Sequence, residues 1–172
     1  MADTLTVLKT RRSCRAYKPE LIEEDKLDAI IEAGTYAATG MGRQSPIIIA
    51  VTDKETRDML SKLNASVMGV DIDPFYGAPE LLVVLADKSV PTYIYDGSLV
   101  MGNLMNAAAD LGVASCWIHR AKEEFESEEG KALLKKLGIE GDYEGIGNLV
   151  LGYAAAPANE PAPRKATYIY KI

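Results

Sequence analysis

The sequence predicts a fold of mixed class, α/β or α+β, in which helices pack against a central sheet. Its 172 residues fit one domain, and 48% of them are apolar, which is enough for a buried core. Helical and strand-like segments alternate along the chain without an internal repeat. The strand-like segments are short apolar runs, as expected of strands buried on both faces. We expect a domain from 1 to 154 and an extended tail from 155 to 172.

Two helices are predicted at the start of the chain, with a basic segment after the first. Residues 3–10 favour a short helix with Leu5 and Leu8 on one face. From Glu23 onward acidic residues occupy a first helical turn. The apolar positions that follow have the spacing i, i+3, i+4 and i+7 of a helix: Leu27, Ile30, Ile31 and Gly34. This helix is expected to fade near Ala38 into the loop TGMGRQSP, which holds two glycines and a proline.

The middle of the chain predicts two strands separated by a helix. Residues 47–51, IIIAV, form the first strand, and Asp53 is suited to cap the helix after it. The inner side of that helix is predicted to carry Met59, Leu60, Leu63 and Val67. After a loop at 71–79, the run LLVVLA at 81–86 predicts the second strand.

The helix predicted at 93–111 is apolar nearly all round, which is typical of a helix buried on every side. Asp96 and Asp110 lie within it, and a carboxylate at mid-bilayer costs about 2.5–3.5 kcal/mol. We therefore expect no membrane association. A domain this small has difficulty enclosing such a helix alone, so we expect a subunit interface along it. Gly112 is suited to end the helix.

The last elements are a third strand at 113–118, a charged helix at 122–137 closed by Gly138, and a fourth strand at 147–153. The tail then contains three prolines in PANEPAP, so residues 157–164 are expected to be extended over roughly 22 Å, at about 3.1 Å per residue. The alternating ending TYIYKI favours a strand that joins a partner subunit's sheet. A frayed tail is the alternative.

The charges are unevenly distributed. The formal net charge of −6 and the pI near 4.9 argue against nucleic-acid binding, which needs a broad cationic face. Yet residues 11–15, RRSCR, are strongly basic, and Arg164 and Lys165 form a second basic group. Cations at a helix end suit its dipole. An anion site explains them too, because guanidinium groups match phosphate oxygens and Ser13 adds a hydroxyl donor. The spacing alone leaves both interpretations open.

Several familiar catalytic motifs are absent. No G-x-G-x-x-G follows a predicted strand, and no Walker loop, G-x-S-x-G or H-E-x-x-H occurs. Cys14 and Cys116 lie far apart, and His119 is the single histidine, so we expect no metal site. We favour a structural role for His119 over a catalytic one. Free thiols and a first segment without an apolar export run favour the cytoplasm.

Four segments, taken together, resemble one known family. RRSCRAY resembles the R-R-S-x-R-x-Y opening of the nitroreductase-like flavoproteins, and AATGMGRQSPIIIAV resembles their A-P-S-x-x-N-x-Q-P-W loop and following strand. DGSLVMGNLMNAAADLGVASCWI resembles their central helix and the Gly-x-x-x-x-Trp strand after it. LGYAAAPANEPAPRK resembles their final strand and basic tail. The segments run in family order from residue 11 to 165.

The resemblance implies a nitroreductase-like fold, with four to five mostly antiparallel or mixed strands flanked by helices and a C-terminal strand exchanged in a homodimer. It also implies one FMN in each of two interface sites. Around the ribityl phosphate it places Arg11, Arg12, Ser13, Arg164 and Lys165. Arg15 falls by the N1 and C2-carbonyl edge of the ring, and Asn64 at the ring's polar edge. Thr39 and Gln44 approach from the glycine loop with Arg43 nearby. Backbone groups near the ring come from Trp117, Ile118 and His119.

The implied activity is hydride transfer from NADH or NADPH through FMN to a small oxidised acceptor, such as a nitroaromatic or a quinone, by a ping-pong mechanism. No protein group is assigned a catalytic role. Gly42 replaces the family's usual Asn and SP replaces PW, so one cofactor contact is expected to be missing. Three alternatives stay open: an FMN sensor or store without turnover, a nucleotide-binding regulator without flavin, and a related flavin chemistry such as dehalogenation or flavin fragmentation.

Overall fold

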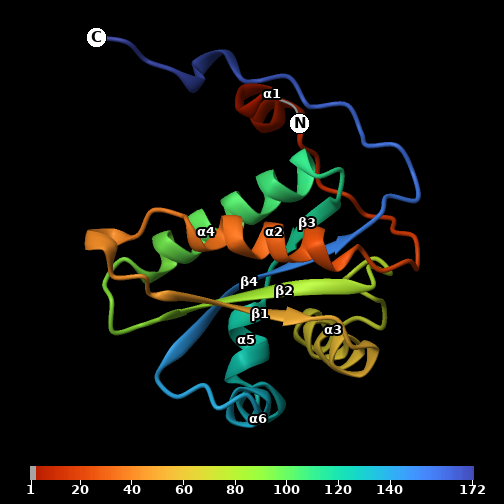
Figure 1. The fold of residues 1–172 in the computed structure, drawn as a ribbon, viewed down its shortest axis with the longest axis vertical. Helices are drawn as coiled ribbons and strands as arrows, with labels where there is room; N and C mark the ends of the chain where they lie inside the picture. The colour runs from red at the N-terminus through yellow and green to blue at the C-terminus, as the bar shows by residue number, and fades with distance from the viewer. Residues whose placement is uncertain (1–2) are drawn as a thin grey trace.

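A computed structural model describes residues 3–172, and it has a four-stranded sheet with helices packed on both faces (Figure 1). The helices of this described part are α1 Thr4–Thr10, α2 Glu24–Thr35, α3 Lys54–Met68, α4 Tyr93–Asp110, α5 Ala121–Glu126 and α6 Glu128–Lys136. The strands are β1 Pro46–Val51, β2 Glu80–Asp87, β3 Ala114–Ile118 and β4 Tyr143–Gly152. Two 3-10 turns cover Gly40–Gly42 and Ala166–Tyr168. The predicted mixed class is confirmed.

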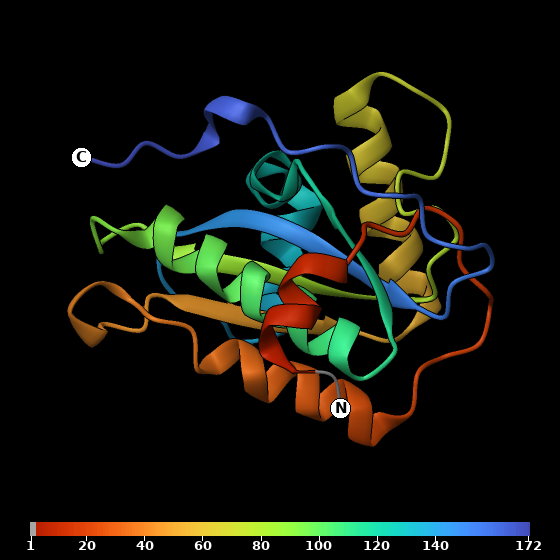
Figure 2. The ribbon, with the colours of Figure 1, turned by 90° about the horizontal axis from the view of Figure 1, so that it is seen from above.

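The sheet is antiparallel throughout, with strand order β1-β2-β4-β3. The central strand β2 divides the core, because successive side chains point to opposite faces. Leu82 and Val84 pack with α2 and α4, whereas Leu81 and Val83 belong to the layer with α3 and α5. The two layers bury every residue of β2 except its last, Asp87, as the apolar run at 81–86 predicted. β3 is left at one edge of the sheet (Figure 2).

Local signals set several element boundaries as predicted. The Asp53 carboxylate caps α3 by accepting a hydrogen bond from the Thr56 N–H at 2.8 Å. Gly112 follows α4 with φ +72°, a left-handed conformation suited to glycine. Gly34 permits the close packing of α2 on α4, because a Cβ there would lie 2.5 Å from Leu104 Cδ2.

Two details of the helical predictions are wrong. The predicted helix at 122–137 is divided at Ser127, which has extended ψ and caps α6 by accepting the Gly130 N–H at 3.0 Å. Serine favours such caps over helix interiors. In α3, Val67 is 44% exposed rather than inner. The buried positions of α3 instead include polar Arg57 and Asn64, which bond to other elements.

Helix α4 and the C-terminal tail are among the regions whose apolar side chains are exposed in the single chain. The single chain leaves Ile94, Tyr95 and Leu99 of α4 exposed, so burial of this helix on every side by a subunit interface stays a prediction. The chain after β4 is extended and exposed, and it leaves the body of the molecule beyond α1 (Figure 1). In place of a terminal strand it forms the turn Ala166–Tyr168. Strand exchange with a partner therefore stays a prediction.

Among the described residues, none of the helices has the length and apolar character needed to span a bilayer.

Candidate functional site

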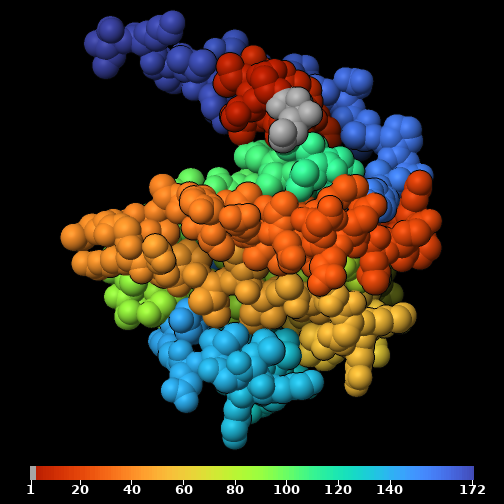
Figure 3. Space-filling model, viewed as in Figure 1, coloured from red at the N-terminus to blue at the C-terminus, as the bar shows by residue number. Residues whose placement is uncertain are grey.

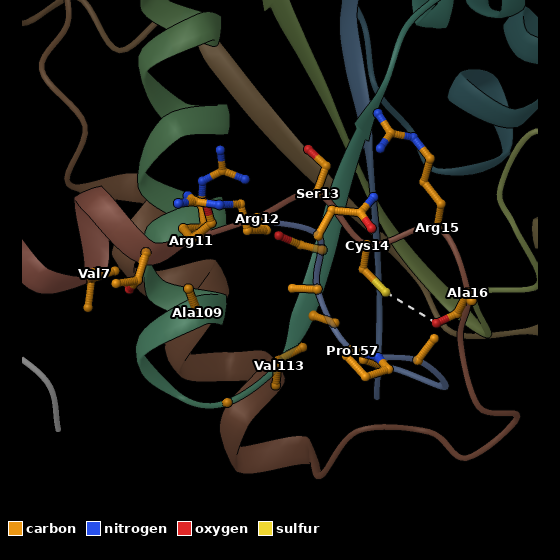
Figure 4. A pocket seen from close by; sticks show the side chains of 18 residues that line it. Val7, Arg11, Arg12, Ser13, Cys14, Arg15, Ala16, Ala109, Val113 and Pro157 are labelled. Atoms are coloured by element: carbon orange, nitrogen blue, oxygen red, sulfur yellow. Dashed lines mark hydrogen bonds between the residues drawn. The ribbon is translucent and has the colours of Figure 1, made fainter. Parts of the chain in front are cut away.

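A cleft of about 440 Å³ lies at the β3 edge of the sheet (Figure 4). Its walls come from the basic segment at residues 10–16, the beginning of β3 at 112–115, and the beginning of the tail at 154 and 156–159. Val7 of α1 and Ala109 of α4 close one side. The cleft therefore joins segments that are far apart in the sequence.

Backbone pairing holds the basic segment in this position. Ser13 forms a parallel bridge with Ser115, and the Cys14 N–H donates to the Ser115 carbonyl at 2.9 Å. Farther along, the Lys18 N–H donates to the Tyr153 carbonyl at 2.8 Å. The segment thus runs beside β3, and Arg15 lies two residues beyond Ser13. At about 3.3 Å per extended residue, roughly 13 Å of backbone separates Arg11 from Arg15.

The cleft is cationic and has no acidic lining residue among those described. Arg12 donates to the carbonyls of Lys9 at 3.0 Å and Arg11 at 2.6 Å. Nη1 of Arg11 is buried and has no hydrogen-bond partner within the described part of the chain. Leaving a buried charged donor unpaired is costly. The arrangement therefore fits an anionic group, such as a phosphate, between these side chains.

The second basic group lies outside this cleft in the same chain. Arg164 is exposed, and its Nη2 donates to the Ala162 carbonyl at 2.7 Å. Lys165 places Nζ 5.3 Å from the centroid of the Tyr168 ring. A single chain therefore does not bring Arg164 and Lys165 to Arg11, Arg12 and Ser13.

The glycine loop contributes to a different cavity, of about 400 Å³, between α2 and β1. Thr39 and Gln44 line it, while Arg43 is exposed on the loop. The Gln44 N–H donates to Thr39 Oγ1 at 3.1 Å. Figures 1 and 2 both show this loop at the opposite end of the molecule from residues 11–16. The predicted FMN contacts of the glycine loop and those of the basic segment therefore lie apart in a single chain.

Asp96 organises that loop, a role the sequence did not indicate. Its buried carboxylate accepts the Gly40 N–H at 2.9 Å and the Ser45 hydroxyl at 2.8 Å. Burial opposes ionisation of this carboxyl, but the hydrogen bonds from Gly40, Ser45 and Thr92 hold its pKa below the ordinary value. The loop itself takes left-handed conformations at Met41, Gly42 and Gln44. Glycine suits φ +66° at position 42.

The predicted residues at the end of β3 lie at different depths. The Trp117 indole packs on Gly147 of β4, where a Cβ would lie 2.2 Å from Nε1. Ile118 is buried and His119 is exposed. Asn64 is 0% exposed and donates to the His119 carbonyl at 2.8 Å. It therefore lies behind the strand end and lines neither cavity described above.

Together, the fold and the cleft define an antiparallel α+β protein with a cationic cleft along one sheet edge. Residues 8–153 match the model of the Nitroreductase family, and the chain belongs to that family. The resemblance seen in the sequence is thereby confirmed.

Individual proteins show how far the similarity extends. A protein of Archaeoglobus fulgidus, named for NADH dehydrogenase or NAD(P)H nitroreductase activity, is 30% identical over 158 residues, covering 89% of this chain and 86% of that protein. A nitroreductase with bound FMN from Bacteroides fragilis superposes over 100% of both chains, with a TM-score of 0.88 and 28% identity. A nitroreductase with bound FMN from Desulfitobacterium hafniense gives a TM-score of 0.88 and 27% identity, again over 100% of both chains.

Proposed function

We propose that this chain is an FMN-dependent oxidoreductase that takes hydride from NADH or NADPH and delivers it to a small oxidised acceptor, such as a nitroaromatic or a quinone. The observation that carries the proposal is the buried, unpartnered Nη1 of Arg11 in an acid-free cleft of the described chain. The FMN in the similar structures and the NAD(P)H activity in the name of the archaeal relative support the same conclusion.

The residues of the cleft fit the phosphate end of FMN. Arg11, Arg12 and Ser13 would hold the phosphate, because charged hydrogen bonds contribute roughly 1.5–3 kcal/mol each. Because the basic segment runs parallel to β3, the ring would lie toward Arg15 and, beyond the lining of the cleft, toward the strand end at Trp117, Ile118 and His119. Arg15 is exposed, so its guanidinium is free of the protein core and available to the ring.

A homodimer would complete the site. Thr39, Gln44 and the tail cations do not reach the cleft of their own chain, so a second copy is the simplest source of them. The exposed apolar side chains of α4 supply a surface for that copy: Ile94, Tyr95 and Leu99. In this arrangement each protomer brings its glycine loop and its tail, with Arg43, Arg164 and Lys165, to the partner's cleft.

The chain's own residues have a limited chemical task in this mechanism. FMN, when bound, supplies the hydride-accepting and hydride-donating chemistry. Arg15 would hold a positive charge beside the bound cofactor and would stabilise its anionic reduced form, as preorganised donors do elsewhere. The open cleft admits water for proton delivery, so no protein acid is assigned. One cleft serves donor and acceptor in turn, which leads us to expect ping-pong kinetics.

The free thiols of Cys14 and Cys116 suit a reducing compartment, and we infer that the enzyme acts in the cytoplasm.

The absorbance spectrum of protein purified with added FMN tests the proposal. We expect a bound flavin spectrum, followed by bleaching when NADH or NADPH is mixed rapidly with the protein. A colourless protein would contradict FMN binding and favour a nucleotide-binding regulator. A bound flavin that neither nicotinamide bleaches would instead indicate a sensor or a store.

A further inference from the structure

A cluster of buried polar side chains lies behind the end of β3. Glu124 of α5 is 0% exposed, and Asn148 Nδ2 of β4 donates to both of its carboxylate oxygens at 2.9 Å. Asn64 Nδ2 of α3 donates to the same carboxylate. Three elements therefore converge on one acid within the mainly apolar layer of α3 and α5. A buried carboxylate is expensive unless it is well bonded, so packing alone does not explain it.

Asn64 connects this acid to the strand end. Its Nδ2 also donates to the His119 carbonyl at 2.8 Å, and its Oδ1 accepts a hydrogen bond from Arg120 Nε at 2.9 Å. Arg120 has φ +79°, a left-handed conformation that is strained for a non-glycine residue and persists only where the surroundings hold it. The bonds of Asn64 supply that hold. The corner after β3 therefore depends on the orientation of one amide.

We propose that Glu124 is a positioning residue that acts through Asn64 to hold the His119 carbonyl and the Arg120 guanidinium at the end of β3, where the proposed function places the flavin ring. This inference rests on the proposed function for the presence of the flavin. Glu124 itself touches no cavity described here, so its effect passes through the amide and the strand end.

The charge state of Glu124 would make this positioning sensitive to pH. Burial raises the pKa of Glu124 to about 7, while the bonds from Asn64 and Asn148 and the charge of Arg120 act against burial. Glu123 on the same helix raises the pKa slightly further, and the facing side chains of α3 and β4 are the neutral amides.

A protonated Glu124 would require a different pattern of hydrogen bonds. As a carboxylate it accepts only, whereas the acid has a proton to donate. Asn148 Oδ1 is buried and, in the described chain, lacks a hydrogen-bond partner. Rotation of that amide would present the oxygen to the new donor. The cluster thus has two possible hydrogen-bond patterns. Asn64 donates to the same carboxylate, so a change from one pattern to the other alters the group to which Asn64 bonds.

The first test uses the apoprotein, so it does not depend on flavin. The NMR resonance of the Arg120 Nε–H is followed across neutral pH in wild type, Glu124→Gln and Glu123→Gln. The glutamine at 124 has the size of glutamate without its titration, and Glu123 is an exposed neighbour that controls for loss of charge. We expect a midpoint near pH 7 in wild type and Glu123→Gln and its loss in Glu124→Gln. A wild-type resonance that does not titrate would overturn the proposal, even if the variant does not fold.

The second test uses the FMN-loaded protein and measures the reduction potential of the flavin against pH. We expect an inflection near pH 7 in wild type and Glu123→Gln that disappears in Glu124→Gln. Bound FMN with the same pH profile in all three proteins would overturn the positioning role and leave the proposed function standing. If the Arg120 resonance shifts with pH but no FMN binds, the proposed function fails, and with it the role at the flavin.

Discussion

The two faces of the sheet differ in what they bury. The layer beneath α2 and α4 is built mainly from buried apolar side chains such as Met101 and Leu104, with the buried Asp96 at its glycine-loop end. The layer beneath α3 and α5 admits charged and amide groups, among them Arg57, Asn64 and Glu124. Apolar burial stabilises any sequence of the right shape, whereas each buried polar group needs particular partners. The comparison suggests that the apolar interior of the α2–α4 layer mainly supports the fold, whereas the polar cluster of the α3–α5 layer mainly supports the end of β3, and four predictions examine it.

The largest expected effect is on the apolar face. Leu104→Ala should lower the free energy of unfolding by about 2–5 kcal/mol, because it empties a fully buried position against Gly34. Urea denaturation measures the loss, and FMN affinity of the folded fraction should not change. Leu21→Ala, at an exposed position, is the matched control. A stable Leu104→Ala with weakened FMN binding would contradict the assignment of the two faces.

The buried acid of the α3–α5 layer should make the free energy of unfolding depend on pH. The pKa of Glu124 lies at about 7 in the folded chain against an ordinary 4.5, so the folded state binds the proton more tightly. Stability from this group is therefore present at low pH and falls as pH rises from about 4.5 through about 7, by at most about 3 kcal/mol. Glu124→Gln should remove that slope in denaturation curves, and Glu123→Gln should keep it. Parallel curves for wild type and Glu124→Gln would be evidence against a titrating buried acid.

A third prediction concerns the cleft. Arg11→Ala should weaken FMN binding at least tenfold, about 1.4 kcal/mol, because it removes charged donors to the phosphate. Combining it with Arg164→Ala should weaken binding further if a partner's tail reaches the cleft. Fluorescence titration of FMN measures both, and Lys18→Ala is a nearby cationic control that does not line the cleft. Unchanged affinity in Arg11→Ala would place the phosphate elsewhere.

The smallest effect is expected at the break between α5 and α6. Ser127→Ala should cost about 1 kcal/mol of unfolding free energy, since the hydroxyl caps α6. FMN affinity should be unaffected. Thermal denaturation measures the loss, and an increase in stability would mean that the sequence prefers the continuous helix.

The sequence predicted the helices and strands better than the long-range contacts between them. All four strands were located by their apolar runs, because such runs are a local property of the chain. The division at Ser127 was missed because the helical pattern continues through it. The pairing of Ser13 with Ser115 joins residues too distant for any local pattern to encode. Glu124 resembled its solvated neighbours in a charged helix, and only its position over Asn64 and Asn148 makes it distinctive.

The backbone bridge between Ser13 and Ser115 has a consequence for assembly of the protein in the cell. An uncovered edge strand is a template on which other chains aggregate. In this protein the segment that would bind the phosphate of the cofactor also pairs with the edge strand β3 and covers it. A saturating cofactor adds to stability by mass action, about 2.7 kcal/mol at a hundredfold excess over its dissociation constant. Newly made chains would therefore depend on riboflavin supply for solubility as well as for turnover.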